Sequence, residues 1–168
     1  GVKAMGGLGG NGVDIMEKRL QKAMELGATG VINGAKEKVE EKISELTGGK
    51  GVDLVIETAG TEITTRQAIH IAKKGSVIVL VGYSKTGEMT LPMSLVLDKE
   101  LTFKSVFRYR HIYPMAIEAV SQGKVNLKGI VTDIFDLDDV QKAMDYSVNN
   151  TADIVNAVIR ICDREDKK

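Results

Sequence analysis

The stretch VDLVIETAG, at residues 52–60, opens with a nearly continuous apolar run and closes in small and polar residues. A run of this kind is typical of a strand that is buried on both faces in a parallel sheet. A second run, SVIVLV at residues 76–81, ends at Gly82-Tyr83 and follows a segment with helical spacing at 61–74. Strand, helix and strand therefore form a crossover unit, which predicts the α/β class.

The alternation continues upstream of this unit. Apolar residues at helical spacing predict helices at 16–26 and 36–46, with a short strand at 29–33 between them. We therefore expect a Rossmann-type, doubly wound parallel sheet. Ligands bind such sheets beyond the carboxyl ends of the strands, so the candidate positions are Asp14, Thr58 and Gly82-Tyr83.

Beyond residue 83 the expected elements are shorter. The run at 89–91 precedes Pro92, so it can only form an edge strand. The pattern then predicts a short helix at 93–99, a strand at 101–107, a helix at 112–122, an extended segment at 130–134, a helix at 137–146 capped by Asp136, and a strand at 154–161. The charged segment 163–168 is expected to be disordered.

Composition excludes several classes of protein. The 23 basic residues balance the 23 acidic ones, so nothing favours a nucleic acid or an anionic membrane as partner. No apolar run approaches the roughly 20 residues that span a bilayer, and residues 1–12 do not resemble a signal peptide. The one cysteine, Cys162, has no partner for an internal disulfide, so we expect a reducing, cytoplasmic location.

The glycine-rich stretch GGLGGNGVDI, at residues 6–15, has competing interpretations. Gly7, Gly9 and Gly12 match G-x-G-x-x-G, which would bind a pyrophosphate between a strand at 2–5 and a helix from residue 13. The acidic residue expected about 20 positions later is missing. Alternatively, Asp14 ends a strand and binds an adenosine ribose, which selects NAD over NADP. Spacing alone also allows Asp14 to be the N-cap of the next helix.

Four segments resemble the medium-chain zinc-dependent dehydrogenases: DIMEKRLQKAMELGA at 14–28, GVDLVIETAG at 51–60, GSVIVLVG at 75–82 and SVFRYRHIYPMAIEAVSQGKVNLKGIVT at 105–132. Within the last, VFRY followed by a helix and GKVNLK is similar to the sorbitol and xylitol (polyol) dehydrogenases. The resemblance covers about residues 2–162.

This resemblance implies roles for particular residues. Asp14 falls on the ribose-binding aspartate, and Arg19 on a basic residue beside the adenosine. Residues 81–83 and 106–108 fall on stretches that line the cofactor, and an arginine fork with a phenol suits a ligand rich in hydroxyls. The implied cofactor-binding residues are Asp14, Arg19, Thr58, Val81, Gly82, Tyr83, Val106, Phe107 and Arg108, and the implied substrate-binding residues are Arg108 and Tyr109.

The sequence also departs from the family. The family's catalytic domain with its zinc ligands has no counterpart, and neither has its first Rossmann strand. His70, His111 and Cys162 form no zinc-ligand cluster of recognised spacing, so no metal ligand or catalytic residue is assigned. We expect residues 1–110 to be a dinucleotide-binding domain without its first strand. Residues 111–168 would be a helix-rich segment and a strand that return, in the family, to the catalytic domain.

The parent function implied by the resemblance is NAD-dependent oxidation of a polyol or another secondary alcohol to a ketone, with zinc assistance. We expect this chain alone to bind NAD weakly or not at all and to be inactive. Two alternatives stay open: a non-catalytic nucleotide-binding or oligomerisation module, and a zinc-free reductase of the same superfamily. Family dimers often join sheets edge to edge near the segment matching 88–91, so a homo-oligomer through an edge strand near Met89 is expected.

Overall fold

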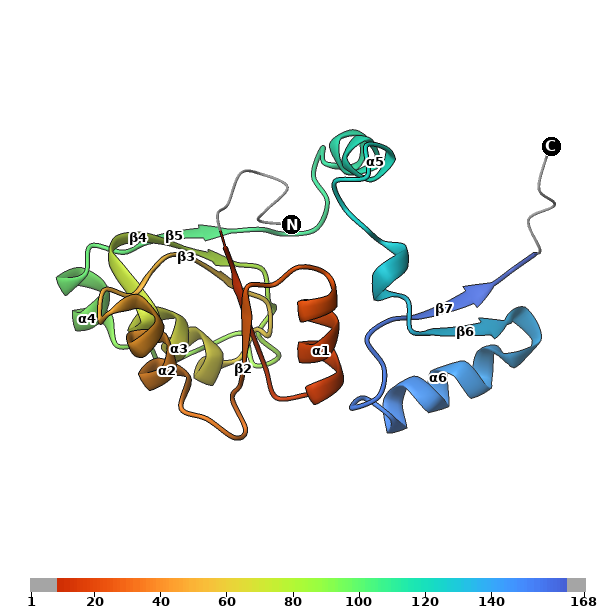
Figure 1. The fold of residues 1–168 in the computed structure, drawn as a ribbon, viewed down its shortest axis with the longest axis horizontal. Helices are drawn as coiled ribbons and strands as arrows, with labels where there is room; N and C mark the ends of the chain where they lie inside the picture. The colour runs from red at the N-terminus through yellow and green to blue at the C-terminus, as the bar shows by residue number, and fades with distance from the viewer. Residues whose placement is uncertain (1–8, 163–168) are drawn as a thin grey trace. The chain divides into compact units, whose positions relative to one another are not determined.

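The computed structural model describes residues 9–162, which fall into two compact units. Unit 2 is the continuous segment Glu37–Tyr113, and unit 1 combines residues 9–36 with residues 114–162. Every strand pairing in both units is parallel. Helices and parallel strands alternate along the chain (Figure 1). The predicted α/β architecture of Rossmann type is therefore confirmed, whereas the domain boundary near residue 110 stays a prediction.

Unit 2 is a three-stranded sheet in the order β3-β4-β5 with three helices beside it (Figure 1). Its elements are α2 (Val39–Thr47), β3 (Val52–Glu57), α3 (Glu62–Ile71), β4 (Ala72–Leu80), α4 (Met93–Asp98) and β5 (Thr102–Ser105). The core lies where β4 meets α3 and α4, and its fully buried members include Ile69 and Ile78. Branched aliphatic residues fill it, as the scarcity of aromatics requires.

The expectation that β3 is buried on both faces is wrong. Leu54 and Ile56 are 44% and 46% exposed, whereas Val55, between them, packs against the core. Residues of a strand point alternately to opposite faces, so one face of β3 meets the core and the other is open. Among residues 9–162, β3 pairs only with β4.

The helix predicted at 61–74 ends earlier than expected, at Ile71, and β4 begins at Ala72. Lys99 explains the difference. Its ammonium donates hydrogen bonds to the carbonyl oxygens of Ile69, His70 and Ala72 at 3.0, 2.6 and 2.8 Å. These carbonyls lie at the end of α3, where helical partners are missing. Partial burial lowers the pKa of Lys99.

The edge strand predicted at 89–91 is also wrong, because these residues form no strand. Both backbone groups of Thr90 are taken by side chains of α3. The amide of Thr90 donates to Glu62 Oε2 at 3.0 Å, and its carbonyl accepts from Arg66 Nη1 at 3.2 Å. A strand partner would have to displace these two contacts.

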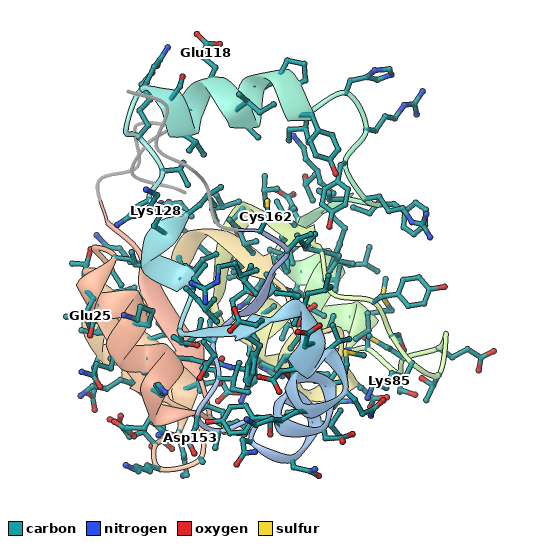
Figure 2. The ribbon with its side chains drawn as sticks, turned by 90° about the vertical axis from the view of Figure 1, so that its right-hand side faces the viewer. Glu25, Lys85, Glu118, Lys128, Asp153 and Cys162 are labelled. Carbon is teal, nitrogen blue, oxygen red and sulfur yellow. The ribbon has the colours of Figure 1, made fainter. Side chains whose placement is uncertain are left out.

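Unit 1 contains two parallel strand pairs, β1-β2 and β6-β7. Its elements are β1 (Asn11–Asp14), α1 (Glu17–Glu25), β2 (Gly30–Asn33), most of α5 (Tyr113–Ser121), the short turns η2 (Lys128–Ile130) and η3 (Leu137–Asp139), β6 (Asp133–Asp136), α6 (Val140–Asn149) and β7 (Ala157–Arg160). No residue of α5 is buried, and its one charged side chain, Glu118, points away from the ribbon (Figure 2).

Asp136 does not cap a helix through its side chain, contrary to the prediction. Its carboxylate Oδ1 instead accepts hydrogen bonds from Arg160 Nε at 2.9 Å and Nη2 at 2.6 Å, which joins the ends of β6 and β7. In the described part of the chain, no helix has the length and apolar character needed to cross a membrane. The strand predicted at 2–5 and the tail at 163–168 lie outside the described residues.

Replacing Lys99 with methionine should lower the free energy of unfolding by about 1–3 kcal/mol, because three carbonyl oxygens lose their hydrogen-bond donor. Chemical denaturation followed by circular dichroism measures this change. The control is Lys74→Met, an exposed lysine of β4, which should change stability by no more than about 0.5 kcal/mol. Equal effects from the two variants would contradict the capping role of Lys99.

Candidate functional site

Asp14 is the last residue of β1, at the carboxyl end of the strand. Its Oδ1 accepts hydrogen bonds from the backbone amides of Ile15 and Met16 at 2.7 and 2.9 Å. The N-cap of α1 is Met16, so Asp14 is not that helix's N-cap. Its Oδ2 lies 3.8 Å from Arg19 Nη1, and no hydrogen bond to this oxygen comes from the described residues. Asp14 and Arg19, both predicted at the ribose, therefore lie side by side. Oδ1 of Asp14 is hydrogen-bonded to the backbone, whereas Oδ2 can still accept a hydrogen bond from a ligand.

The glycine pattern does not form a phosphate-binding turn in its described part. Gly12 lies inside β1, paired with Val31, and α1 begins only at Glu17. A Cβ at Gly12 would lie 3.4 Å from Ala23 Cβ, so this side of β1 faces α1. Gly7, the first glycine of the pattern, lies outside the described residues.

Glu57, at the carboxyl end of β3, organises the ends of two strands. The residue is 4% exposed, and its carboxylate accepts hydrogen bonds from the amides of Ala59 and Gly60, at 2.8 and 3.0 Å, and from Thr64 Oγ1 at 2.8 Å. Its carbonyl accepts from the amides of Val81 and Gly82 at 2.8 and 3.1 Å. One residue therefore fixes both the turn after β3 and the turn after β4.

The two turns touch through their backbones. A Cβ at Gly82 would lie 2.1 Å from the Gly60 amide nitrogen, and a Cβ at Gly60 would lie 2.6 Å from the Tyr83 backbone. Gly60 also has a φ of +67°, a conformation that favours glycine. No other residue type fits this contact without moving the backbone.

A pocket of about 540 Å³ opens beyond the carboxyl ends of β4 and β5. It is lined by Leu80, Val81, Gly82, Tyr83, Ser105, Val106, Phe107, Arg108 and Tyr109. Seven of the positions predicted from the resemblance therefore lie together. Three of the chain's seven aromatic residues, Tyr83, Phe107 and Tyr109, are among them. Exposed aromatic rings around a concave surface are typical of a small-molecule site.

Thr58 stands apart from this pocket. It is exposed in the turn after β3 and does not contribute to the pocket wall. Asp14 and Arg19 belong to unit 1, whereas the pocket belongs wholly to unit 2. Apart from Thr58, the predicted residues therefore fall into two groups, one in each unit.

The described residues do not fit a zinc site. Among residues 9–162, no three side chains of His, Cys, Asp or Glu come together in a way that could hold a metal ion. A structural zinc needs four such ligands and a catalytic zinc needs three.

Sequence reasoning missed Glu57 as an organising residue. The available signal was its place directly after an apolar strand and three residues before a glycine. A carboxylate there reaches the free amides of the following turn, as Asx and related side chains do in other turns.

The parallel strand pairings and the alternation of strands with helices place the chain in the Rossmann-type class of α/β folds. The family model described as zinc-binding dehydrogenase matches residues 2–122, so the chain belongs to this family.

Individual relatives agree with this assignment. The chain is 44% identical over 151 residues to the uncharacterized zinc-type alcohol dehydrogenase-like protein YdjJ of Escherichia coli K12, covering 90% of this chain and 43% of that protein. It is 33% identical over 135 residues to sorbitol dehydrogenase of Bacillus subtilis, covering 80% and 38%. The crystal structure of 2R,3R-butanediol dehydrogenase from Bacillus subtilis superposes with a TM-score of 0.85 at 28% identity, covering 96% and 46%.

These findings confirm the resemblance to zinc-type polyol dehydrogenases. The chain spans about two-fifths of the length of the curated relatives it matches.

Replacing Glu57 with glutamine should lower the free energy of unfolding by about 1–3 kcal/mol, because its new amide group faces donors at the turn. Thermal and urea unfolding measure the loss. The matched control is Asp53→Asn on the same strand, whose exposed pair with Lys73 at 3.0 Å should contribute no more than about 1 kcal/mol. A Glu57→Gln variant as stable as the unaltered chain would contradict the role of Glu57 in fixing the two turns.

Proposed function

We propose that this chain is the coenzyme-binding part of an NAD-dependent polyol dehydrogenase, which oxidises a secondary alcohol to a ketone. The observation that carries the proposal is the pocket beyond β4 and β5, where seven positions expected at the cofactor and substrate lie together. NAD supplies the hydride acceptor for this reaction. The family and its sorbitol dehydrogenase relative support this substrate class.

The pocket residues suit a flat, amphipathic ring such as nicotinamide. Aromatic side chains provide large apolar surfaces with preferred stacking geometries. The amides of Val81 and Gly82 both donate to the Glu57 carbonyl, which fixes the direction of the chain at this turn. A rigid backbone with aromatic neighbours orients a ring without spending binding energy on ordering the site.

On unit 1, Asp14 suits a ribose diol. The two backbone amides hold Oδ1, which leaves Oδ2 as a charged acceptor for a ribose hydroxyl. The same charge disfavours a 2′-phosphate, so NAD is preferred over NADP. Arg19 lies beside this carboxylate, with its Nη1 3.8 Å from Asp14 Oδ2.

NAD binding by the isolated chain should be weak. Asp14 lies in one compact unit and the aromatic pocket in the other, and within residues 9–162 no sheet includes strands of both. Each unit alone offers a dinucleotide only part of the contacts expected from the resemblance, and this limits its affinity. Residues 9–162 do not group three side chains that could hold a zinc ion, and we expect this chain alone not to turn over sorbitol with NAD.

Titration of the chain with NADH, followed by fluorescence, tests the proposal. We expect measurable but weak binding, which Asp14→Ala reduces by about tenfold or more through loss of a charge-assisted hydrogen bond. The matched control is Asp136→Ala, another aspartate at a strand end beside an arginine, which should leave NADH binding unchanged. Sub-micromolar affinity would contradict the weak-binding expectation. NADH binding that Asp14→Ala leaves unchanged would contradict the ribose-binding role of Asp14.

Two alternatives give different results in the same titration. A zinc-free reductase of this superfamily would bind NADPH in preference to NADH, against the charge of Asp14. A non-catalytic module would bind NADH with no dependence on Asp14.

We further propose that the chain forms a homo-oligomer, as its polyol dehydrogenase resemblance implies. We do not expect the two copies to pair through an edge strand at Met89, because the backbone groups of Thr90 are hydrogen-bonded to Glu62 and Arg66. Light scattering of the purified chain should give more than the monomer mass of 18.2 kDa. A strictly monomeric mass would refute the oligomer.

A further inference from the structure

We infer that Glu17 is a second determinant of cofactor choice, because it pairs with Lys36 and keeps this cation from a phosphate at the ribose 2′-position. Glu17 acts through Lys36 and is therefore a positioning residue, whereas Asp14 would contact the ribose itself. The inference rests on the proposed function, since it specifies how the same ribose site distinguishes NAD from NADP.

The loop after β2 lies directly beside Asp14. Asp14 and Asn33 are the last residues of β1 and β2 and lie opposite each other in the register of the two strands. The amide of Gly34 donates a hydrogen bond to the carbonyl oxygen of Asp14 at 3.0 Å, and Lys36 follows two residues later. Ligands of parallel α/β sheets bind beyond these carboxyl ends of the strands. Lys36 therefore belongs to the loop at the proposed ribose site.

Asn33 fixes the direction of the Glu17 side chain. The residue is 7% exposed, and its side-chain oxygen accepts a hydrogen bond from the amide of Ala35 at 3.0 Å. Its side-chain nitrogen donates to Glu17 Oε2 at 2.8 Å. Because a buried amide needs partners for both its oxygen and its nitrogen, these contacts set its orientation. Glu17, the first residue of α1, is thereby held toward the loop after β2.

Lys36 donates to the same carboxylate oxygen. Its ammonium nitrogen lies 2.9 Å from Glu17 Oε2. The hydrogen bonds from Lys36 and Asn33, together with the charge of Lys36, lower the pKa of the Glu17 carboxyl below its usual value. Glu17 is therefore ionised at neutral pH. A phosphate that binds Lys36 has to replace this contact and to approach a second carboxylate besides Asp14.

This arrangement affects a 2′-phosphate more than a free 2′-hydroxyl. Sites that accept NADP provide a cation next to the ribose, and lysine binds phosphate as a point charge. Two ion pairs lie at the proposed ribose site, Asp14–Arg19 at 3.8 Å and Glu17–Lys36 at 2.9 Å. In each pair, a carboxylate opposes a cation that a phosphate would use. The diol of NAD needs only the Asp14 carboxylate, so Glu17 acts mainly against NADP.

The pair between Glu17 and Lys36 can be removed without unfolding the protein. The two side chains are 70% and 68% exposed, and exposed ion pairs contribute little to stability. An effect of Glu17 variants on ligand choice is therefore separable from an effect on folding.

Nuclear magnetic resonance titration of the ¹⁵N-labelled chain tests the inference without requiring tight binding. The probes are 5′-AMP and adenosine 2′,5′-bisphosphate, which differ only by the 2′-phosphate, and inorganic phosphate. In the unaltered chain, the amides of residues 14–17 and 33–36 should report tighter binding of 5′-AMP than of the bisphosphate. Glu17→Gln should raise the affinity for the bisphosphate about three- to fivefold and change that for 5′-AMP by less than about twofold.

Lys36 should be the source of this gain. Adding Lys36→Gln to Glu17→Gln should therefore abolish it. The matched control is Glu25→Gln, which removes a carboxylate that pairs with Lys22 in the last turn of the same helix. This control should leave both affinities unchanged, because screening weakens the effect of a distant exposed charge. Thermal unfolding of each variant checks that it is folded.

An unchanged affinity for the bisphosphate in Glu17→Gln, with intact 5′-AMP binding, would overturn the inference and leave the proposed function standing. A gain that persists without Lys36, or that Glu25→Gln reproduces, would also overturn it, because net charge alone would explain the effect. An equal gain for inorganic phosphate would show that the loop binds an adventitious ion only, with the same consequence. Absence of amide shifts at residues 14–17 with both adenosine probes would contradict the ribose-binding role of Asp14, and the inference with it.

Discussion

The buried carboxylate of Glu57 is the constraint on which the unit 2 site depends. A charged group that is almost fully buried is tolerated only when hydrogen-bond donors surround it, and here two backbone amides and a hydroxyl do so. Its own carbonyl fixes the neighbouring turn. Glu57 therefore ties together the turns that follow β3 and β4, and the aromatic side chains of the pocket lie next to these turns.

Much of this fold follows from local patterns in the sequence. The apolar runs at 52–56 and 76–81 and the helical spacing at 16–26 and 61–74 give the right elements in the right order. The errors come from tertiary contacts that no local pattern contains. Lys99 ends α3 from almost 30 residues away, and α3 side chains capture the backbone of Thr90. Burial of β3 was overestimated because periodicity does not reveal what covers a strand.

The candidate site was predictable in a different way. Its residues came from the resemblance of whole segments to a family, and the positions at 81–83 and 106–109 do line one pocket. The bare glycine pattern was misleading, because Gly12 lies within β1 and faces α1 rather than forming a phosphate-binding turn. The role of Glu57 is not predictable from the sequence, because its partners are backbone amides, and a sequence does not show which amides a side chain reaches.

The contact between Gly60 and Gly82 limits how this pocket can diversify. The obstacle to a larger residue at either position is backbone, so no second substitution nearby creates the missing space. Buried contacts usually change in evolution through pairs of substitutions in which one side chain becomes larger and its neighbour smaller. Such a compensating pair cannot relieve the contact between Gly60 and Gly82. Ligand preference can therefore change through the side chains of residues 83 and 105–109, while Gly60 and Gly82 stay glycine.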